Sequence, residues 1–375
     1  MKKLIVLSVV FALVASTAFA VDIGANVFGL VTPVQGGFGK DTNGTDLSSD
    51  ITSSGGFQRA RISGSGDVAD GAFGGWFRYD LGGGFGAYAF WKPIDQVKVL
   101  IGGNPDGMYG KEGVTGWMLH ENPYDGGVAI FGGNVWGGGM QSSIKTRDVF
   151  FGGYGGNALH VNVAPVEIFT FNLVLPFWGN SWDAGNEISD VLPNVKAQLD
   201  FNLEFGNIAL TYDGDGDGGK VFLYFGGPIG PLGLDVGVSY GLNDSKIGAG
   251  LGLKFATDTF GIKFRLVTTI DGSDLNLLGE LVPYLTFSDK LAVFLGIGVA
   301  YAGAGYEFTD YGTTGNPKRH TDNGTIDFYV NPYLRIGEEW GAQFLVGFQL
   351  YSKQGLGGDY SSINWALPIA IMVSF

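Results

Sequence analysis

Residues 195–205 read Val-Lys-Ala-Gln-Leu-Asp-Phe-Asn-Leu-Glu-Phe, and apolar and polar side chains alternate over the whole stretch. Successive side chains of a β-strand point to opposite faces of its sheet, so this stretch predicts a strand with one apolar and one polar face. A strand of a soluble protein usually has about 5–6 residues. An alternating run of about 10 residues is typical of a tilted strand that crosses a membrane.

The same alternation recurs in the second half of the chain. It covers residues 234–240, 247–255, 260–266 and 325–336. The second face of these segments consists largely of glycine and scattered charged residues. Glycine weakens a strand unless the space it leaves is needed, and the inner wall of a barrel is a place that needs such space.

The composition excludes several classes of protein. The chain has 375 residues, 66 glycines, no cysteine, 14% aromatic residues and a formal net charge of −14. The absence of cysteine excludes disulfide scaffolds and cysteine metal sites. The acidic balance argues against nucleic-acid binding, and the aromatic content argues against disorder. The mean hydropathy of +0.17 is too high for an ordinary soluble surface.

The N-terminus predicts export from the cytoplasm. Two lysines precede an apolar run at residues 4–14, and residues 18–20 read Ala-Phe-Ala. A basic start, a short apolar core and a small-x-small motif together form the pattern of a secretory signal peptide. We therefore expect residues 1–20 to be a signal peptide and residues 21–375 to be the mature domain.

The mature chain has no apolar run long enough for a membrane-spanning helix, which needs about 18 residues or more. A closed β-barrel is the other structure that satisfies every backbone group in lipid. We therefore expect an all-β fold, a transmembrane antiparallel up-and-down β-barrel, with about 16 strands and a range of about 14–18. The alternative is a large secreted all-β protein with unusually regular strands.

Tight turns and longer polar segments separate the expected strands. The tight turns are expected at residues 205–207, 257–258, 271–274 and 288–290. The longer loops are expected at residues 32–56, 103–126, 179–194 and 307–324. Short turns at one end and longer loops at the other are the usual arrangement of outer-membrane barrels.

The C-terminus ends on an alternating strand. Every second residue of this final segment is apolar, including Trp365, Ile371, Val373 and the last residue, Phe375. Such an ending resembles the β-signal by which bacterial outer-membrane proteins are handed to their assembly machinery. The resemblance implies a cell outer-membrane location, with outer-membrane lipid and the barrel-assembly machinery as partners. Pro368 departs from the pattern, because it lacks the N–H of a ladder hydrogen bond.

Four short segments near the N-terminus carry arginine, lysine and aromatic residues at strand spacing: residues 57–62, 76–80, 87–93 and 97–102. They resemble the early hairpins of Gram-negative porins, including the phosphate-selective type, in which arginine-bearing strands line the pore. The resemblance implies a water-filled channel for small hydrophilic solutes or ions, and it admits a homo-oligomer. The chain lacks the Pro-Glu-Phe-Gly-Gly segment of the general trimeric porins, so it implies neither their trimer nor their eyelet.

Charged residues on the second face of the strands are candidates for the pore lining. A charge on the lipid face of a barrel strand costs about 2–4 kcal/mol near the membrane midplane, so we expect these side chains to point inward. They are Arg59, Arg61, Arg78, Lys98, Lys196, Asp200, Glu204, Asp235, Lys254, Lys263, Arg265, Glu280, Asp327 and Arg335. Rings of charge set the selectivity of wide pores, and the basic excess on the strands suggests a preference for anions.

A glycine-rich segment at residues 213–218 matches the first half of a calcium loop. Asp213, Asp215 and Asp217 would be its ligands, but the twelfth position, which should be acidic, is Tyr224. Asp and Gly also form tight turns without any metal. We therefore favour a hairpin turn over a weak calcium site, and we expect no metal or other cofactor.

The three histidines, His120, His160 and His320, show neither metal-ligand nor catalytic-triad spacing, so we expect no enzyme. The function that fits best is a porin for passive diffusion of small hydrophilic solutes or ions. One alternative is an outer-membrane barrel that acts as a surface adhesin or structural protein through its acidic loops. Another is a channel for hydrophobic substrates, but the chain has no hatch-like N-terminal segment or evident apolar pocket.

Overall fold

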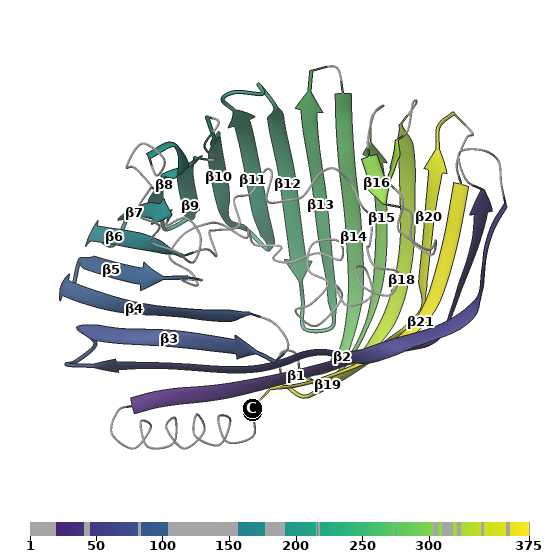
Figure 1. Ribbon diagram of the computed structural model, residues 1–375, viewed down its shortest axis with the longest axis horizontal. Coiled ribbons are helices and arrows are strands. Elements are labelled where there is room, and N and C mark those ends of the chain that lie inside the picture. Colours follow the sequence, from purple (N-terminus) through teal and green to yellow (C-terminus); the bar gives the residue numbers. More distant parts are fainter. Residues whose placement is uncertain are drawn as a thin grey trace.

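The structure is a computed structural model that covers the whole chain (Figure 1). The residues it describes are 20–40, 46–81, 84–103, 157–176, 192–214, 216, 218–272, 274–302, 307–309, 318–320, 324–338, 341–357 and 361–374. The expected signal peptide, apart from Ala20, and the expected loop at 103–126, apart from its first residue, lie outside these residues. Among the described residues, no helix is long and apolar enough to span a membrane.

Almost all described residues belong to β-strands. The strands are β1 (Ala20–Lys40), β2 (Asp46–Val68), β3 (Phe73–Asp80), β4 (Phe85–Ile94), β5 (Val97–Gly102), β6 (Ala158–Val166), β7 (Phe169–Pro176), β8 (Lys196–Leu203), β9 (Gly206–Asp213), β10 (Lys220–Ile229), β11 (Leu232–Gly241), β12 (Ile247–Ala256), β13 (Phe260–Asp271), β14 (Asp274–Ser288), β15 (Leu291–Ala302), β16 (Glu307–Thr309), β17 (Lys318–His320), β18 (Thr325–Gly337), β19 (Gln343–Gly347), β20 (Gln349–Gly355) and β21 (Ser361–Ser374). A short 3-10 helix at Leu192–Asn194 precedes β8.

These strands form one closed antiparallel barrel, with β16 and β17 as a separate small hairpin. From β1 to β15 each strand pairs with the next along the chain, and β15 then pairs with β18. β19 and β20 each pair with both β18 and β21, and β21 pairs with β1 to close the wall (Figure 1). Counting β19 and β20 as one strand, the described barrel has 18 strands. The predicted antiparallel β-barrel is confirmed, and the strand number lies at the upper end of the expected range.

Two prolines explain why β19 and β20 are separate. Both segments pair with β18 in one unbroken register, because Tyr333 pairs with Gly347 and Val330 pairs with Leu350. Pro332 on β18 and Pro368 on β21 flank the break between them. Proline has no N–H to donate to a ladder. The loss of ladder bonds expected at Pro368 therefore interrupts one strand without shifting its register.

The loop expected at residues 32–56 is mostly strand instead. β1 and β2 pair along nearly their whole lengths, with Thr32 opposite Ser54 and Gln35 opposite Thr52, and with bulges between these positions. Small polar residues and glycine suggested a loop, but cross-strand pairing satisfies the backbone of both segments. In contrast, the strand expected at residues 195–205 ends earlier, because β8 stops at Leu203.

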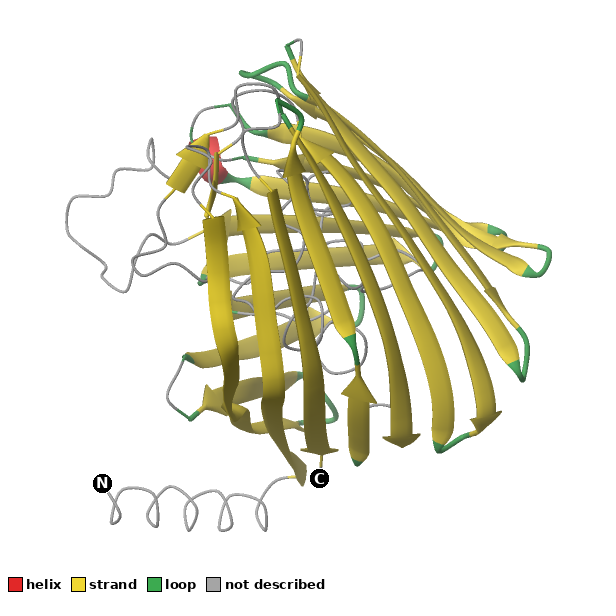
Figure 2. Ribbon diagram, turned by 90° about the vertical axis from the view of Figure 1, so that its right-hand side faces the viewer, coloured by secondary structure: helices red, strands yellow, loops and turns green. Residues whose placement is uncertain are grey.

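The short turns gather at one end of the barrel, which we call the turn end. They include the predicted tight turns at residues 257–258 and 288–290. Ala20 pairs with Asp67 beside the β2–β3 turn, so β1 starts at this end. Figure 2 shows the C-terminus there too. The opposite end, called the loop end, carries the long β5–β6 connection, but also the predicted tight turn after Asp271, so short and long connections do not alternate strictly.

The outer face of the barrel is apolar and carries an aromatic belt near the turn end. Phe73 stacks on Trp91 with ring centroids 6.3 Å apart, and Phe169 and Phe201 are 5.4 Å apart. Phe287, on β14, is 64% exposed in the isolated chain. Aromatic rings at the edge of an apolar outer band mark the membrane interface in transmembrane barrels.

Candidate functional site

The inner wall is identified by burial that alternates along each strand. On β8, Lys196, Gln198 and Asp200 are buried, whereas Phe201, on the other face, is 41% exposed. On β13, Arg265 is only 2% exposed and stands next to the exposed Leu266. Charged groups cannot face lipid cheaply, so the face with the buried polar groups is the inner wall.

Most of the predicted pore-lining residues lie on this inner face. Those placed there are Arg61, Arg78, Lys98, Lys196, Asp200, Asp235, Lys254, Lys263, Arg265, Glu280 and Arg335. Glu204 differs from the expectation, because β8 ends before it and the exposed Glu204 lies in the β8–β9 turn. Arg59 and Asp327 belong to paired strands, but their side chains lie outside the described residues.

A network of amides, a carboxylate and a hydroxyl crosses β6 to β9 on the inner wall. Asn162 Nδ2 donates to Asn172 Oδ1 at 2.7 Å, and Asn172 Nδ2 donates to Asp200 Oδ2 at 3.4 Å. Gln198 Nε2 donates to the same Asp200 oxygen at 2.7 Å. Thr211 Oγ1 donates to Gln198 Oε1 at 3.1 Å. We call these five residues the polar network, and each of its members bonds to a neighbour on the wall.

An ion pair stands on the loop-end side of the polar network. The Lys196 ammonium pairs with the Asp213 carboxylate and donates to the Gly214 carbonyl oxygen, 2.7 Å away. Asp213 was predicted as the first ligand of the calcium loop. Its carboxylate is paired with the Lys196 ammonium, whose positive charge would repel a calcium ion at this position. Asp215 and Asp217 lie outside the described residues. Among the described residues, no group of His, Asp and Glu is arranged to hold a metal ion.

A row of charged residues and glycines crosses β11 to β14. Asp235 lies opposite Gly252, Gly252 opposite Arg265, and Arg265 opposite Glu280. Tyr224 Oη donates a hydrogen bond of 2.8 Å to Asp235 Oδ1. The missing side chain of Gly252 leaves room between the two large charged groups.

Glycines on the inner wall also leave room for aromatic rings. A Cβ atom on Gly226 would overlap the Tyr224 hydroxyl, one on Gly261 would overlap the ring of Tyr284, and one on Gly74 would overlap that of Phe90. The sequence predicts that glycine on the inner wall leaves space free. The structure shows that much of this space is filled by a neighbouring aromatic side chain.

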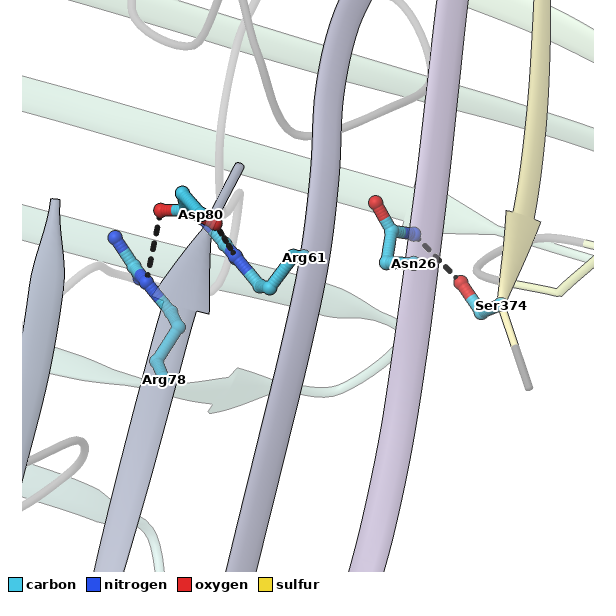
Figure 3. Close-up of polar contacts among 5 residues, drawn as sticks. All are labelled: Asn26, Arg61, Arg78, Asp80 and Ser374. Atoms are coloured by element: carbon cyan, nitrogen blue, oxygen red, sulfur yellow. Dashed lines mark hydrogen bonds and ion pairs between the residues drawn. The ribbon is translucent and has the colours of Figure 1, made fainter. Parts of the chain in front are cut away.

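Two arginines share one aspartate near the seam of the barrel (Figure 3). Arg61 Nε donates to Asp80 Oδ1 at 2.7 Å, and Arg78 Nε lies 3.2 Å from Asp80 Oδ2. The cluster has a net charge of +1, and its side chains are 21–32% exposed. Beside it, Asn26 Nδ2 donates to Ser374 Oγ at 2.7 Å, which joins β1 to β21.

A second basic group lies at the turn end of β4 and β5. The Lys98 ammonium is 4.3 Å from the centroid of the Phe90 ring, and the Lys92 ammonium is 5.7 Å from it. A cation over an aromatic face is stabilised by the quadrupole of the ring. Lys92 was not among the residues predicted to line the pore, although it has the same strand parity as Phe90.

An aromatic stack lies on β14, β15 and β18, away from the basic group of β4 and β5. Tyr284, Phe294 and Tyr333 stand in one cross-strand row, with centroid distances of 5.3 Å and 4.5 Å. The rings of Phe294 and Tyr333, 4.5 Å apart, are parallel to within 6°, so they stack face to face. The guanidinium of Arg335 lies 5.5 Å from the Phe294 centroid. The stack thus ties three strands together on the inner side.

The stack borders an apolar patch that the alternation pattern does not predict. This inner patch consists of Phe28, Tyr333, Leu345, Ala366, Ala370 and Met372. It spans the seam, because β1 pairs with β21. The signal for it lay in the final segment, where the face opposite Ile371 is itself apolar, with Ala366, Ala370 and Met372.

The comparisons with known proteins agree with this architecture. No family model and no curated protein matches the sequence. Among solved structures, OpdQ of Pseudomonas aeruginosa has a TM-score of 0.52 at 8% identity, over 94% of this chain and 98% of its own. A BenF-like porin of Pseudomonas fluorescens Pf-5 has a TM-score of 0.51 at 9% identity, over 95% and 98%. OpdL of P. aeruginosa has a TM-score of 0.51 at 8% identity, over 95% and 99%.

At these identities the likeness concerns the fold. It extends over almost the whole of this chain and of each porin. This chain also has an apolar outer face and charged groups on its inner wall. The chain therefore has the fold of the outer-membrane porins, a closed antiparallel β-barrel of 18 strands.

Proposed function

We propose that the protein is a porin of a bacterial outer membrane, through which small hydrophilic solutes and ions pass by passive diffusion without catalysis. The observation that carries the proposal is the contrast between the two faces of one closed wall. The outer face exposes aliphatic and aromatic side chains, whereas the inner face holds arginine, lysine, carboxylate and amide groups. The porins that share the fold support the same function.

The ends of the chain fit export and insertion into that membrane. Residues 1–20 would be removed as a signal peptide, so the mature chain would start at Val21, within the first barrel strand. Trp365, Ile371 and Val373 lie on the outer face of β21, and Phe375 follows it just beyond the described residues. These four residues would serve as the assembly signal.

Pairs of basic residues on the inner wall are expected to attract anions. Its described basic residues, by strand position, are Arg61, Arg78, Lys92, Lys98, Lys196, Lys220, Lys254, Lys263, Arg265 and Arg335. Its described acidic residues, by strand position, are Asp22, Asp67, Asp80, Asp200, Asp213, Asp235, Asp271, Asp274 and Glu280, so the basic excess on the described inner wall is one residue. Lys254 and Lys263 lie directly opposite each other on neighbouring strands. Their like charges repel each other, and a passing anion would reduce this repulsion. Nothing in the described residues favours the adhesin alternative.

Swelling of proteoliposomes tests the proposal. Vesicles that contain the refolded barrel should swell in isotonic solutions of small sugars and amino acids, and the rate should fall as the solute becomes larger. Folding is checked on the same samples by electrophoresis, where the folded barrel should change its mobility on boiling. A properly folded barrel that leaves the swelling rate at the level of protein-free vesicles would refute the pore.

A further inference from the structure

Acidic side chains recur in the connections at the turn end of the barrel. Eight connections join neighbouring strands there, and seven of them carry an acidic residue that the structure describes. These residues, all of them exposed, are Asp70, Asp95, Glu167, Glu204, Asp258, Asp289 and Glu338. Within the described chain the β10–β11 turn is the exception, because it consists of Gly230 and Pro231. Since the strands follow one another around a closed wall, the seven residues surround the mouth, and we call them the acidic ring.

Turn formation alone does not account for the acidic ring. Asp is frequent in turns because its side chain bonds to the nearby backbone, but Glu is not among the residues that turns favour. Three of the seven members are Glu. Lys290 is the one basic residue in the described part of these connections, so the ring together with it has a net charge of −6. Its ammonium lies 3.3 Å from Glu338, but both side chains are well exposed, so water weakens this pair.

A pair of lysines stands just inside the acidic ring. Lys254 and Lys263 form one ladder pair of β12 and β13, and Ala256 and Gly261 form the last pair toward the turn end. At about 3.3 Å per residue, the lysines stand about 7 Å inside that end of the ladder. Both lysine side chains are half-buried on the inner wall, whereas Asp258, in the turn between the two strands, is exposed at the rim. The sign of the charge therefore reverses between the rim and the wall.

We propose that the acidic ring makes the pore rectify, so that more current flows when the turn-end side is positive. A ring of carboxylates concentrates cations at the mouth, and the lysines inside it concentrate anions. A positive potential on the turn-end side drives cations inward from the ring and anions outward from the wall. Both kinds of ion then collect between the two levels and raise the conductance, whereas the opposite potential depletes them. The carboxylates act through their field and need not hold an ion, and the inference rests on the proposed pore.

Single-channel current–voltage curves of the full-length barrel in symmetric potassium chloride test the acidic ring. At about 0.1 M salt, where the Debye length is about 10 Å, currents at equal voltages of opposite sign should differ by at least about twofold. At about 1 M salt, where the Debye length is about 3 Å, the two currents should become nearly equal. The variant Glu167→Gln/Glu204→Gln/Asp258→Asn/Asp289→Asn keeps the shapes of the side chains and should lose the asymmetry. The control Asp271→Asn/Asp274→Asn neutralises a directly opposed acidic pair at the loop end and should rectify like the wild type.

A second measurement changes the charge of the ring on a channel that is already conducting. The chain has no cysteine, so Asp258→Cys provides a single attachment point in the ring. A positively charged, membrane-impermeant thiol reagent should weaken the asymmetry and a negatively charged one should strengthen it, and faster reaction from one chamber identifies the turn-end side. This result decides the question even if the fourfold variant does not fold.

Three results would overturn the role of the ring and leave the pore intact. They are equal currents in both directions through the wild type at about 0.1 M salt, a larger current with the turn-end side negative, and an asymmetry that persists when the ring is neutralised. Absence of any conductance from a folded barrel would instead refute the pore, and the role of the ring with it.

Discussion

The polar network and the inner patch hold opposite sides of the same wall in different ways. In the polar network, side chains of β6 to β9 hydrogen-bond across strands, and each contact needs a particular partner. In the inner patch, residues from β1, β18, β19 and β21 pack by shape. The comparison teaches that an inner wall can be stabilised either by directed bonds or by close packing.

The two regions should therefore respond to different kinds of substitution. Packing tolerates a change of chemistry when volume is kept, but it does not tolerate a buried charge. A hydrogen-bonded network tolerates polar groups, but it is sensitive to the loss of one partner.

The largest effect is expected from Leu345→Asp in the inner patch. Leu345 is fully buried, so the new carboxylate would be placed among apolar groups at a cost of several kcal/mol, on the order of 3–5. The variant should fail to give a folded band that shifts on boiling. Thr211→Asn, in the polar network, keeps a donor for Gln198 Oε1 and should still fold. Equal folded yields of the two variants would contradict the distinction between a packed inner patch and a hydrogen-bonded polar network.

A smaller effect is expected from Tyr224→Phe, which removes the hydrogen bond to the buried Asp235. Loss of a partner from a buried acceptor should lower the free energy of unfolding by about 1–3 kcal/mol. Met372→Leu in the inner patch keeps the volume and should cost less, under about 1.5 kcal/mol. Urea titrations in detergent or lipid measure both. If Met372→Leu lowers the free energy of unfolding more than Tyr224→Phe does, hydrogen bonding is not the more sensitive kind of contact on the inner wall.

The smallest effect is expected from Gly261→Ala, where the added Cβ would overlap the ring of Tyr284. Displacing this ring from the aromatic stack should cost about 1 kcal/mol, as overpacking does. Gly279→Ala is the control on the paired strand, because its Cβ would meet only Leu266 Cδ1 at 3.7 Å. The urea midpoint should fall only for Gly261→Ala. If both variants unfold at the same urea concentration, the ring does not depend on the glycine.

The faces of the strands could be predicted from the sequence because their signal is local. Alternation over β13 and β18 shows directly which side chains share a face, and the buried Arg265 and Arg335 are where that pattern predicts them. The closed barrel followed from the same pattern together with the export signal. The extended β1–β2 hairpin was missed, because Thr32 and Ser54 look like loop residues until they pair.

The contacts within the wall could not be predicted, because they depend on register between distant segments. The sequence does not show that Phe294 stands beside Tyr333, or that Asp80 takes both Arg61 and Arg78. The inner patch joins Phe28 to Met372 from opposite ends of the chain. Only closure of the barrel brings such residues together.

Single-channel recording across a planar bilayer in a potassium chloride gradient tests the central claim most directly, namely that this wall encloses a water-filled pore in which paired basic residues, such as Lys254 and Lys263, attract anions. We expect discrete conductance steps and a reversal potential shifted toward that of chloride. Arg61→Glu/Arg78→Glu should move the reversal potential toward that of potassium, because the cluster at Asp80 then becomes negative. Absence of steps from a folded barrel, or a wild-type reversal potential on the potassium side, would contradict the account.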